Sequence, residues 1–179
     1  MTEQKAIQGC KKQDRICQKH LFDLFADKML MVCMRYVNNL HDAEELMLNG
    51  FYLCFRSIST FSYNGDGSLS AWLRKIMVNE CLMHLRKKGR LKLESVTEFT
   101  DCDTEPAALA NLEAADIYKM ILELPEGYRT VLNLYIIEGY SHKEIAELLE
   151  ITEGTSKSQL SKAKAMLRIK LKKNESYAG

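Results

Sequence analysis

The sequence has no long hydrophobic run, because its longest apolar stretch, around Met29–Met34, is bounded by Lys28 and Arg35. A helix that spans a bilayer needs about 20 predominantly apolar residues, so we expect no membrane-spanning segment. The opening residues, MTEQKAIQGCKKQDR, are polar and lack the apolar core of a signal peptide. These absences predict a soluble cytoplasmic protein.

Proline and glycine are scarce, with 2 and 9 residues, whereas 46% of the 179 residues are hydrophobic. This composition excludes collagen-like and low-complexity chains and is too apolar for a disordered tail. The net charge of +1 indicates no class of partner by itself. The six cysteines form no CxxC motif and no Cys/His pair at zinc-ligand spacing, so we expect no metal and no cofactor. We expect Cys33, Cys54 and Cys81 to be buried thiols within helices.

Nearly every periodic segment repeats its apolar residues at helical spacing, and no stretch alternates as a half-buried strand does. In the N-terminal half, Asn38-Asn39 ends one predicted helix, and Asp42 with Glu45 forms the N-cap of the next. Ser68 is predicted to cap a third helix, which ends in a run of cations. In the C-terminal half, the predicted helix boundaries are Pro125, Gly139, the capping box Ser141–Glu144, and Thr152.

Between these halves the periodicity lapses, and residues 91–111 hold the acidic residues Glu94, Glu98, Asp101, Asp103 and Glu105. We interpret this segment as a flexible acidic linker. The predicted fold is all-α, with two small helical domains at residues 14–90 and 112–173.

The last two predicted helices have the spacing of a helix-turn-helix, packed through Ile145, Ala146, Ile151 and Leu160. The second helix begins with hydrogen-bonding side chains that can reach base edges or phosphates, namely Thr155, Ser156, Lys157, Ser158, Gln159 and Lys162. Farther along, Lys164 and Arg168 add positive charge that suits a phosphate backbone. The alternative is a basic helix face that is merely solvated.

Aromatic residues cluster at the junction of the second and third predicted helices, beside the cations Arg74 and Lys75. Aromatic rings next to cations are typical of a groove for unpaired bases. Rings such as Phe51 lie on apolar stripes and are assigned to the core. Phe61 and Tyr63 fall in the loop and are the stronger candidates for stacking on bases.

The N-terminal half contains the segments Asp42–Leu46, Gly50-Phe51, Gly67–Ile76 and Val78-Asn79, which together resemble region 2 of bacterial sigma factors. The segments that resemble region 4 are Leu124–Leu132, Glu138–Ala146 and Gly154–Ala163. The short two-domain form is similar to the extracytoplasmic function (ECF) group of the sigma-70 family. The resemblance covers roughly Leu21–Lys88 and Leu112–Leu171.

This resemblance implies a transcription initiation factor, and not an enzyme, that binds the clamp helices and flap of core RNA polymerase. It implies recognition of a duplex −35 element and of a single-stranded −10 element, with help in strand opening. An anti-sigma factor is common in the family, and the acidic linker is expected to occupy a basic channel of the polymerase. The family's usual Gln-Glu pair is replaced here by Leu48-Asn49.

The resemblance also assigns residues to each contact. The polymerase-binding residues are Asp42, Glu45, Leu46, Asn49 and Phe51. The −10 residues are Phe61, Tyr63, Asn64, Ser68, Asn79, Arg86, Lys87 and Lys88. The residues that match the family's −35 positions lie in the recognition helix at Lys157, Gln159, Ser161 and Lys162. We add Thr155, Ser156 and Ser158 to the −35 residues because of their hydrogen-bonding side chains.

Two other interpretations remain open. A one-component helix-turn-helix regulator would bind duplex DNA without polymerase, as a symmetric dimer. A helical scaffold with a basic tail would show no sequence preference. No catalytic arrangement competes with these, because the four histidines are scattered and the sequence has no phosphate-binding glycine loop or nucleophile elbow.

Overall fold

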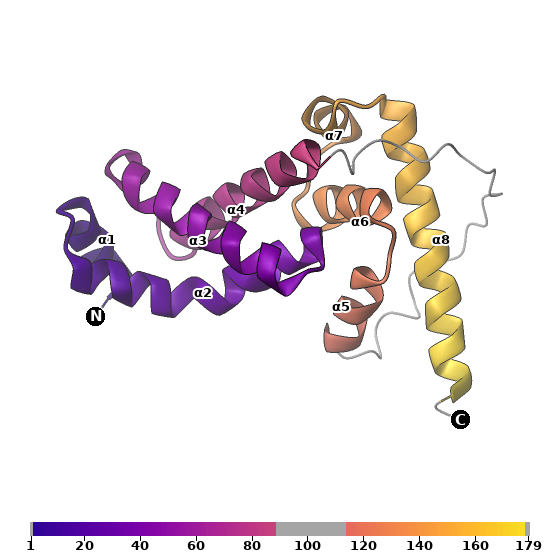
Figure 1. The fold of residues 1–179 in the computed structure, drawn as a ribbon, viewed down its shortest axis with the longest axis horizontal. Coiled ribbons are helices and arrows are strands. Elements are labelled where there is room, and N and C mark those ends of the chain that lie inside the picture. Colours follow the sequence, from indigo (N-terminus) through magenta and orange to yellow (C-terminus); the bar gives the residue numbers. More distant parts are fainter. Residues whose placement is uncertain (1, 89–113, 178–179) are drawn as a thin grey trace. The chain divides into compact units, whose positions relative to one another are not determined.

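The computed structural model describes residues 2–88 and 114–177, whose regular elements are all helical (Figure 1). These residues form two compact units, which divide in the sequence at His84 and Leu85, within one helix. The prediction of an all-α fold with two helical parts is therefore confirmed. The predicted linker, residues 91–111, lies outside the described residues.

The first unit is built from helices that occupy the N-terminal half of the chain. They are α1 (Glu3–Lys11), α2 (Arg15–Val37), α3 (Leu40–Ser57), the 3-10 helix η1 (Ile58–Thr60) and α4 (Ser68–Lys87). The sequence analysis predicted no helix before the segment of Phe22 and Phe25, because α1 is short, at nine residues, and polar on average. It is nevertheless packed, and it buries Ala6, Ile7 and Cys10.

The boundary between α2 and α3 lies where two asparagines are adjacent. Asn38 ends α2 in the left-handed conformation, with φ of 46°. The side chain of Asn39 then accepts a hydrogen bond from the Asp42 amide at 2.9 Å, so Asn39 is the N-cap of α3. The predicted N-cap, Asp42, is therefore wrong. Asp42 lies in the first turn instead, and its carboxylate is 3.5 Å from the imidazole Nε2 of His84.

Helices α2, α3 and α4 enclose the core of the first unit. A Cβ atom built on Gly50 would lie 2.2 Å from the Met77 sulfur, so α3 and α4 approach closely at this glycine. Between α2 and α4, Cys33 and Cys81 share a hydrogen bond, which together with burial raises the pKa of the Cys81 thiol. The predicted burial of Cys33, Cys54 and Cys81 is confirmed, and none of the three forms a disulfide.

Apart from the end of α4, the described residues of the second unit form four α-helices and one π-helix. They are α5 (Ala114–Leu122), α6 (Glu126–Leu132), the π-helix Asn133–Ile137, α7 (His142–Leu149) and α8 (Glu153–Tyr177). Buried Arg129 of α6 donates to the carbonyl oxygens of Leu122 and Leu124, at 3.1 and 2.9 Å. Since the last carbonyls of a helix lack partners within it, this arginine fixes the end of α5.

The predicted helix boundaries of the second unit are confirmed. Pro125 is the N-cap of α6, and Gly139 follows the π-helix with φ of 78°, which an L side chain rarely adopts. Thr152 accepts a hydrogen bond from the Thr155 amide at 3.0 Å at the start of α8. The π-helix itself was not predicted, because the apolar pattern of residues 131–137 does not distinguish it from an α-helix.

Candidate nucleic-acid interface

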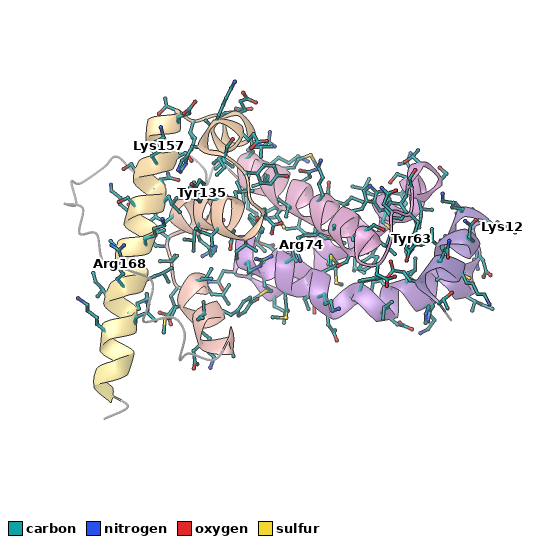
Figure 2. The ribbon with its side chains drawn as sticks, turned by 180° about the vertical axis from the view of Figure 1, so that it is seen from behind. Lys12, Tyr63, Arg74, Tyr135, Lys157 and Arg168 are labelled. Atoms are coloured by element: carbon teal, nitrogen blue, oxygen red, sulfur yellow. The ribbon has the colours of Figure 1, made fainter. Side chains whose placement is uncertain are left out.

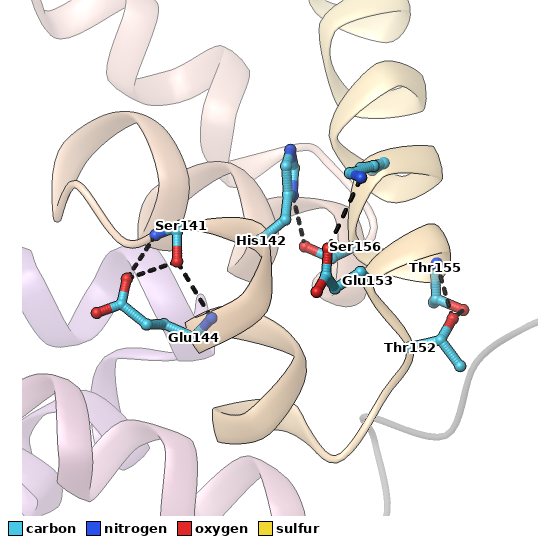
Figure 3. A network of polar contacts seen from close by, with 8 residues as sticks. Ser141, His142, Glu144, Thr152, Glu153, Thr155 and Ser156 are labelled. Atoms are coloured by element: carbon cyan, nitrogen blue, oxygen red, sulfur yellow. Dashed lines mark hydrogen bonds and ion pairs between the residues drawn. The ribbon is translucent and has the colours of Figure 1, made fainter.

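The turn between α7 and α8 is held by local hydrogen bonds at both helix starts (Figure 3). Ser141 and Glu144 form a reciprocal capping box, in which the Glu144 carboxylate accepts from the Ser141 amide at 2.8 Å. These hydrogen bonds lower the pKa of Glu144. Glu150 ends α7 in the left-handed conformation, with φ of 56°. The helix-turn-helix predicted from the sequence is therefore present, with both helix starts and the left-handed turn defined by local structure.

A second set of contacts joins α7 to α8 and to the π-helix. The Nδ1 atom of His142 is 2.9 Å from the Ser156 hydroxyl, and the imidazole stacks on the Tyr135 ring at a centroid distance of 4.5 Å. Burial, followed by the nearby Lys157 ammonium, lowers the pKa of His142. This histidine is therefore best accommodated in its neutral form, as a bridge between three elements.

One face of α8 carries mostly basic residues. Its members recur every three or four residues and are Lys157, Ser161, Lys164, Arg168 and Lys172, which we call the basic stripe; all are exposed except Arg168, which is half-buried. Figure 2 shows two of its members along the same helix. The ammonium of Lys157 lies 3.7 Å from the Glu153 carboxylate, an exposed pair that is readily exchanged for another anion. Positive charge in one row is suited to a DNA backbone.

Three residues predicted to contact DNA lie instead on the buried side of α8. Ser156 is fully buried, and Gln159 and Lys162 are each only 9% exposed. A Cβ atom built on Gly127 of α6 would lie 3.3 Å from the Gln159 amide nitrogen, and the Lys162 ammonium is 6.0 Å from the centroid of the Tyr128 ring. We therefore correct their assignment: they pack α8 against its neighbours. Of the other predicted −35 residues, Lys157 and Ser161 are exposed, and Thr155 and Ser158 are half-buried.

The loop between η1 and α4 is closed by its own polar groups. The Tyr63 hydroxyl donates to Asp66 at 2.7 Å, and the Ser68 hydroxyl donates to the Gly65 carbonyl at 2.7 Å while accepting from the Asn64 amide at 3.3 Å. Ser68 is the first residue of α4, so its hydroxyl ties the loop together and does not act as the predicted N-cap. The loop thus has a defined shape, with exposed Asn64 at its surface.

Phe61 differs most from its predicted role. Its ring is only 6% exposed and packs on Trp72 at a centroid distance of 4.9 Å. A ring in that position belongs to the base of the loop and is not open to stack on a nucleotide. Four other residues predicted to contact the −10 element are exposed on α4 or directly after it, namely Asn79, Arg86, Lys87 and Lys88.

The candidate polymerase-binding residues on α3 divide in the same way. Glu45 and Asn49 are exposed, whereas Leu46 and Phe51 are core residues. The Phe51 ring packs on the Phe22 ring at a centroid distance of 4.8 Å. Asp42 is half-buried beside α4. We therefore correct the assignment of Leu46 and Phe51, which face the interior of the unit.

The outward side of α3 carries Leu48, which replaces part of the family's Gln-Glu pair, and Tyr52, which was not predicted to take part in this contact. Leu48 and Tyr52 are 54% and 60% exposed, and the Arg56 guanidinium lies 5.6 Å from the centroid of the Tyr52 ring. Together with Glu45 and Asn49 they form what we call the outer face of α3. The signal available in the sequence was their helical spacing off the core stripe.

A helix-turn-helix with a basic recognition helix defines a DNA-binding protein. Within the part of the chain that the structure describes, no three His, Cys, Asp or Glu side chains are grouped to hold a metal ion. None of the helices in these described residues is both long enough and apolar enough to cross a membrane.

Comparison with known proteins identifies the family. The family model described as Sigma-70 region 2 matches residues 21–91, and Sigma-70, region 4 matches residues 114–167. The chain is 30% identical to the ECF RNA polymerase sigma factor SigW of Bacillus subtilis, over 96% of this chain and 98% of that protein. It is 31% identical to the ECF RNA polymerase sigma factor SigE of Mycolicibacterium smegmatis, over 91% of this chain and 63% of that protein.

Among solved structures, the sigma factor RpoE of Bartonella quintana, in complex with the anti-sigma factor NepR, matches with a TM-score of 0.49 at 24% identity, over 87% of this chain and 96% of that one. From the sequence matches, the chain belongs to the ECF RNA polymerase sigma factors of the sigma-70 family. Its function is RNA polymerase-directed initiation of transcription.

Proposed function

We propose that the second unit places α8 in the major groove of a −35 element, with the basic stripe along the DNA. The exposure of Lys157 and Ser161 on one face near the helix start is the observation that carries this proposal. A lysine and a hydroxyl at that end can donate to base edges or to phosphates. Lys164, Arg168 and Lys172 continue the same face and supply charge that suits the phosphate backbone.

The first unit is proposed to hold the separated strand of the −10 element. Tyr63 and Asn64 lie on the closed loop, and Asn79 is exposed on α4. Because extrusion of a base costs a few kcal/mol, the surface that receives it must be formed in advance. The internal hydrogen bonds of the loop support such a role, and Phe61 contributes as the buried support of the loop.

Core RNA polymerase is proposed to bind the outer face of α3. Exposed Leu48 and Tyr52 offer apolar contact area, and tyrosine and arginine are enriched among residues that dominate binding energy at interfaces. Glu45 and Asn49 border this area with polar groups. Held on one polymerase, the two DNA-binding units act at high effective concentration, so that weak individual contacts suffice.

In this proposal the polymerase carries out the chemistry of transcription. The protein acts only by binding, in the cytoplasm. The acidic linker of residues 91–111 remains a predicted occupant of a basic polymerase channel. An anti-sigma factor also remains a predicted partner.

Run-off transcription tests the proposed function. Purified bacterial core polymerase is incubated with and without the protein on a library of genomic fragments. We expect new transcripts that share two upstream elements, and we expect Lys157→Ala to reduce them. Lys119→Ala is the matched control, because it removes an exposed lysine of α5 in the same unit. Binding to duplex DNA without any polymerase-dependent transcript would favour the one-component regulator.

A further inference from the structure

Helix α1 contacts the base of the candidate −10 loop. The Lys11 ammonium, in the last turn of α1, donates to the carbonyl oxygen of Phe61 at 2.7 Å, across fifty positions of sequence. Figure 2 shows Tyr63 at the same end of the unit as Lys12, which directly follows α1. The matched region 2 segment begins at residue 21, so α1 lies outside it.

The position of α1 is itself well fixed. Ala6, Ile7 and Cys10 are buried, and a Cβ atom on Gly9 would lie only 2.2 Å from the Cys17 sulfur of α2. So close an approach leaves α1 little room to slide along α2. Lys11 therefore extends from a firm support toward the loop.

The carbonyl of Phe61 lies at a point where regular structure ends. The Phe61 amide still donates to the Ile58 carbonyl at 3.2 Å, as the last bond of η1, and the Phe61 ring is fixed on Trp72. Beyond it the chain turns toward Tyr63 and Asn64. A partly buried hydrogen bond from an ammonium is stronger than one between neutral groups, so Lys11 fixes the direction in which the loop leaves η1.

We propose that Lys11 is a positioning residue for −10 recognition, which holds the Phe61 carbonyl so that Tyr63 and Asn64 face the unpaired strand. This inference rests on the proposed role of the loop. Helix α1 thereby gains a function that neither its sequence nor its surface suggests.

The test compares Lys11→Met with Lys5→Met in the full chain. Both remove one lysine of α1 at little cost in helix propensity, and Lys5 is exposed on the same helix. The first measurement is amide hydrogen exchange of residues 62–67 in the protein alone. The second is the affinity of the reconstituted holoenzyme for a single-stranded −10 oligonucleotide from a promoter found by run-off transcription.

We expect Lys11→Met to speed exchange in the loop and to weaken oligonucleotide binding about tenfold, because a loop released from this hydrogen bond must be ordered when it binds. Lys11→Arg should restore both, since its guanidinium also donates to a carbonyl. Affinity for core polymerase and for −35 duplex should remain unchanged, which a general loss of folding would not allow.

Other outcomes separate the two proposals. If the wild-type holoenzyme fails to bind the −10 oligonucleotide, the proposed function of the loop is wrong. If the wild type binds and Lys11→Met binds equally well, the positioning role is overturned even when the loop exchanges faster. An equal defect in Lys5→Met would also overturn it.

Discussion

Lys157 and Gln159 are two residues apart on α8, yet they face opposite environments. Lys157 projects to solvent with 62% of its side chain exposed, whereas Gln159 is 9% exposed and packs against Gly127 of α6. We therefore predict that Lys157→Ala and Gln159→Ala change different properties of the protein. The first should lose DNA affinity without loss of stability, and the second should lose stability.

The magnitudes follow from these environments. Loss of a lysine contact to DNA costs about 1–3 kcal/mol, which is roughly 5- to 150-fold in affinity, and lowers the salt dependence by about one ion if the contact is to phosphate. The exposed pair of Lys157 with Glu153 contributes no more than about 1 kcal/mol to stability. Truncation of buried Gln159 should lower the free energy of unfolding by about 1–2 kcal/mol. For a unit of this size, each kcal/mol lowers Tm by about 4–8 °C.

Two measurements on each variant decide the matter. Thermal unfolding by circular dichroism reports stability, and fluorescence anisotropy of the holoenzyme with a −35 duplex, well below both Tm values, reports affinity. We expect Gln159→Ala to bind DNA within about threefold of wild type under these conditions. A loss of more than tenfold with an unchanged Tm would refute the assignment of Gln159 to packing.

Three further predictions concern single features. The pKa of His142 is lowered from 6.5, so just below that pH the folded unit binds fewer protons than the unfolded chain. Its free energy of unfolding should therefore fall as pH decreases in that range. Urea titrations at several pH values can measure this fall, which should be smaller in His142→Gln. Gly50→Leu forces a side chain against buried Met77 and should destabilise the first unit by about 1–3 kcal/mol in urea unfolding, whereas the same change at exposed Asn49 should not. Tyr52→Ala should weaken binding to core polymerase by about 2 kcal/mol in a pull-down titration while leaving Tm unchanged. An unaffected affinity would exclude the outer face of α3 as the polymerase contact.

Much of the secondary structure could be predicted from the sequence because helix ends are local. The capping box of Ser141 and Glu144, the left-handed Asn38 and Gly139, and the cap at Thr152 each involve partners within a few residues. Their hydrogen bonds form wherever the backbone turns in that way, whatever packs above them. The cap of α3 was misplaced because Asn39 and Asp42 are both good N-cap residues, and local sequence does not choose between them.

The motifs also determined the family and the order of its two DNA-binding regions. The exposed members of the candidate site, Lys157, Ser161, Asn64 and Asn79, were all present in the sequence prediction. Their residue types suit hydrogen bonding to nucleic acid wherever a helix or loop leaves them open to solvent.

Only the tertiary structure decided which polar side chains are exposed to solvent. Ser156 and Gln159 resemble DNA-reading residues by type, but His142 and Gly127 come from other helices and enclose them. Likewise Lys11 reaches Phe61 only because α1 folds back beside η1. Burial depends on neighbours distant in sequence, and a polar side chain that finds such a partner is withdrawn from solvent at little cost, so composition and spacing do not reveal it.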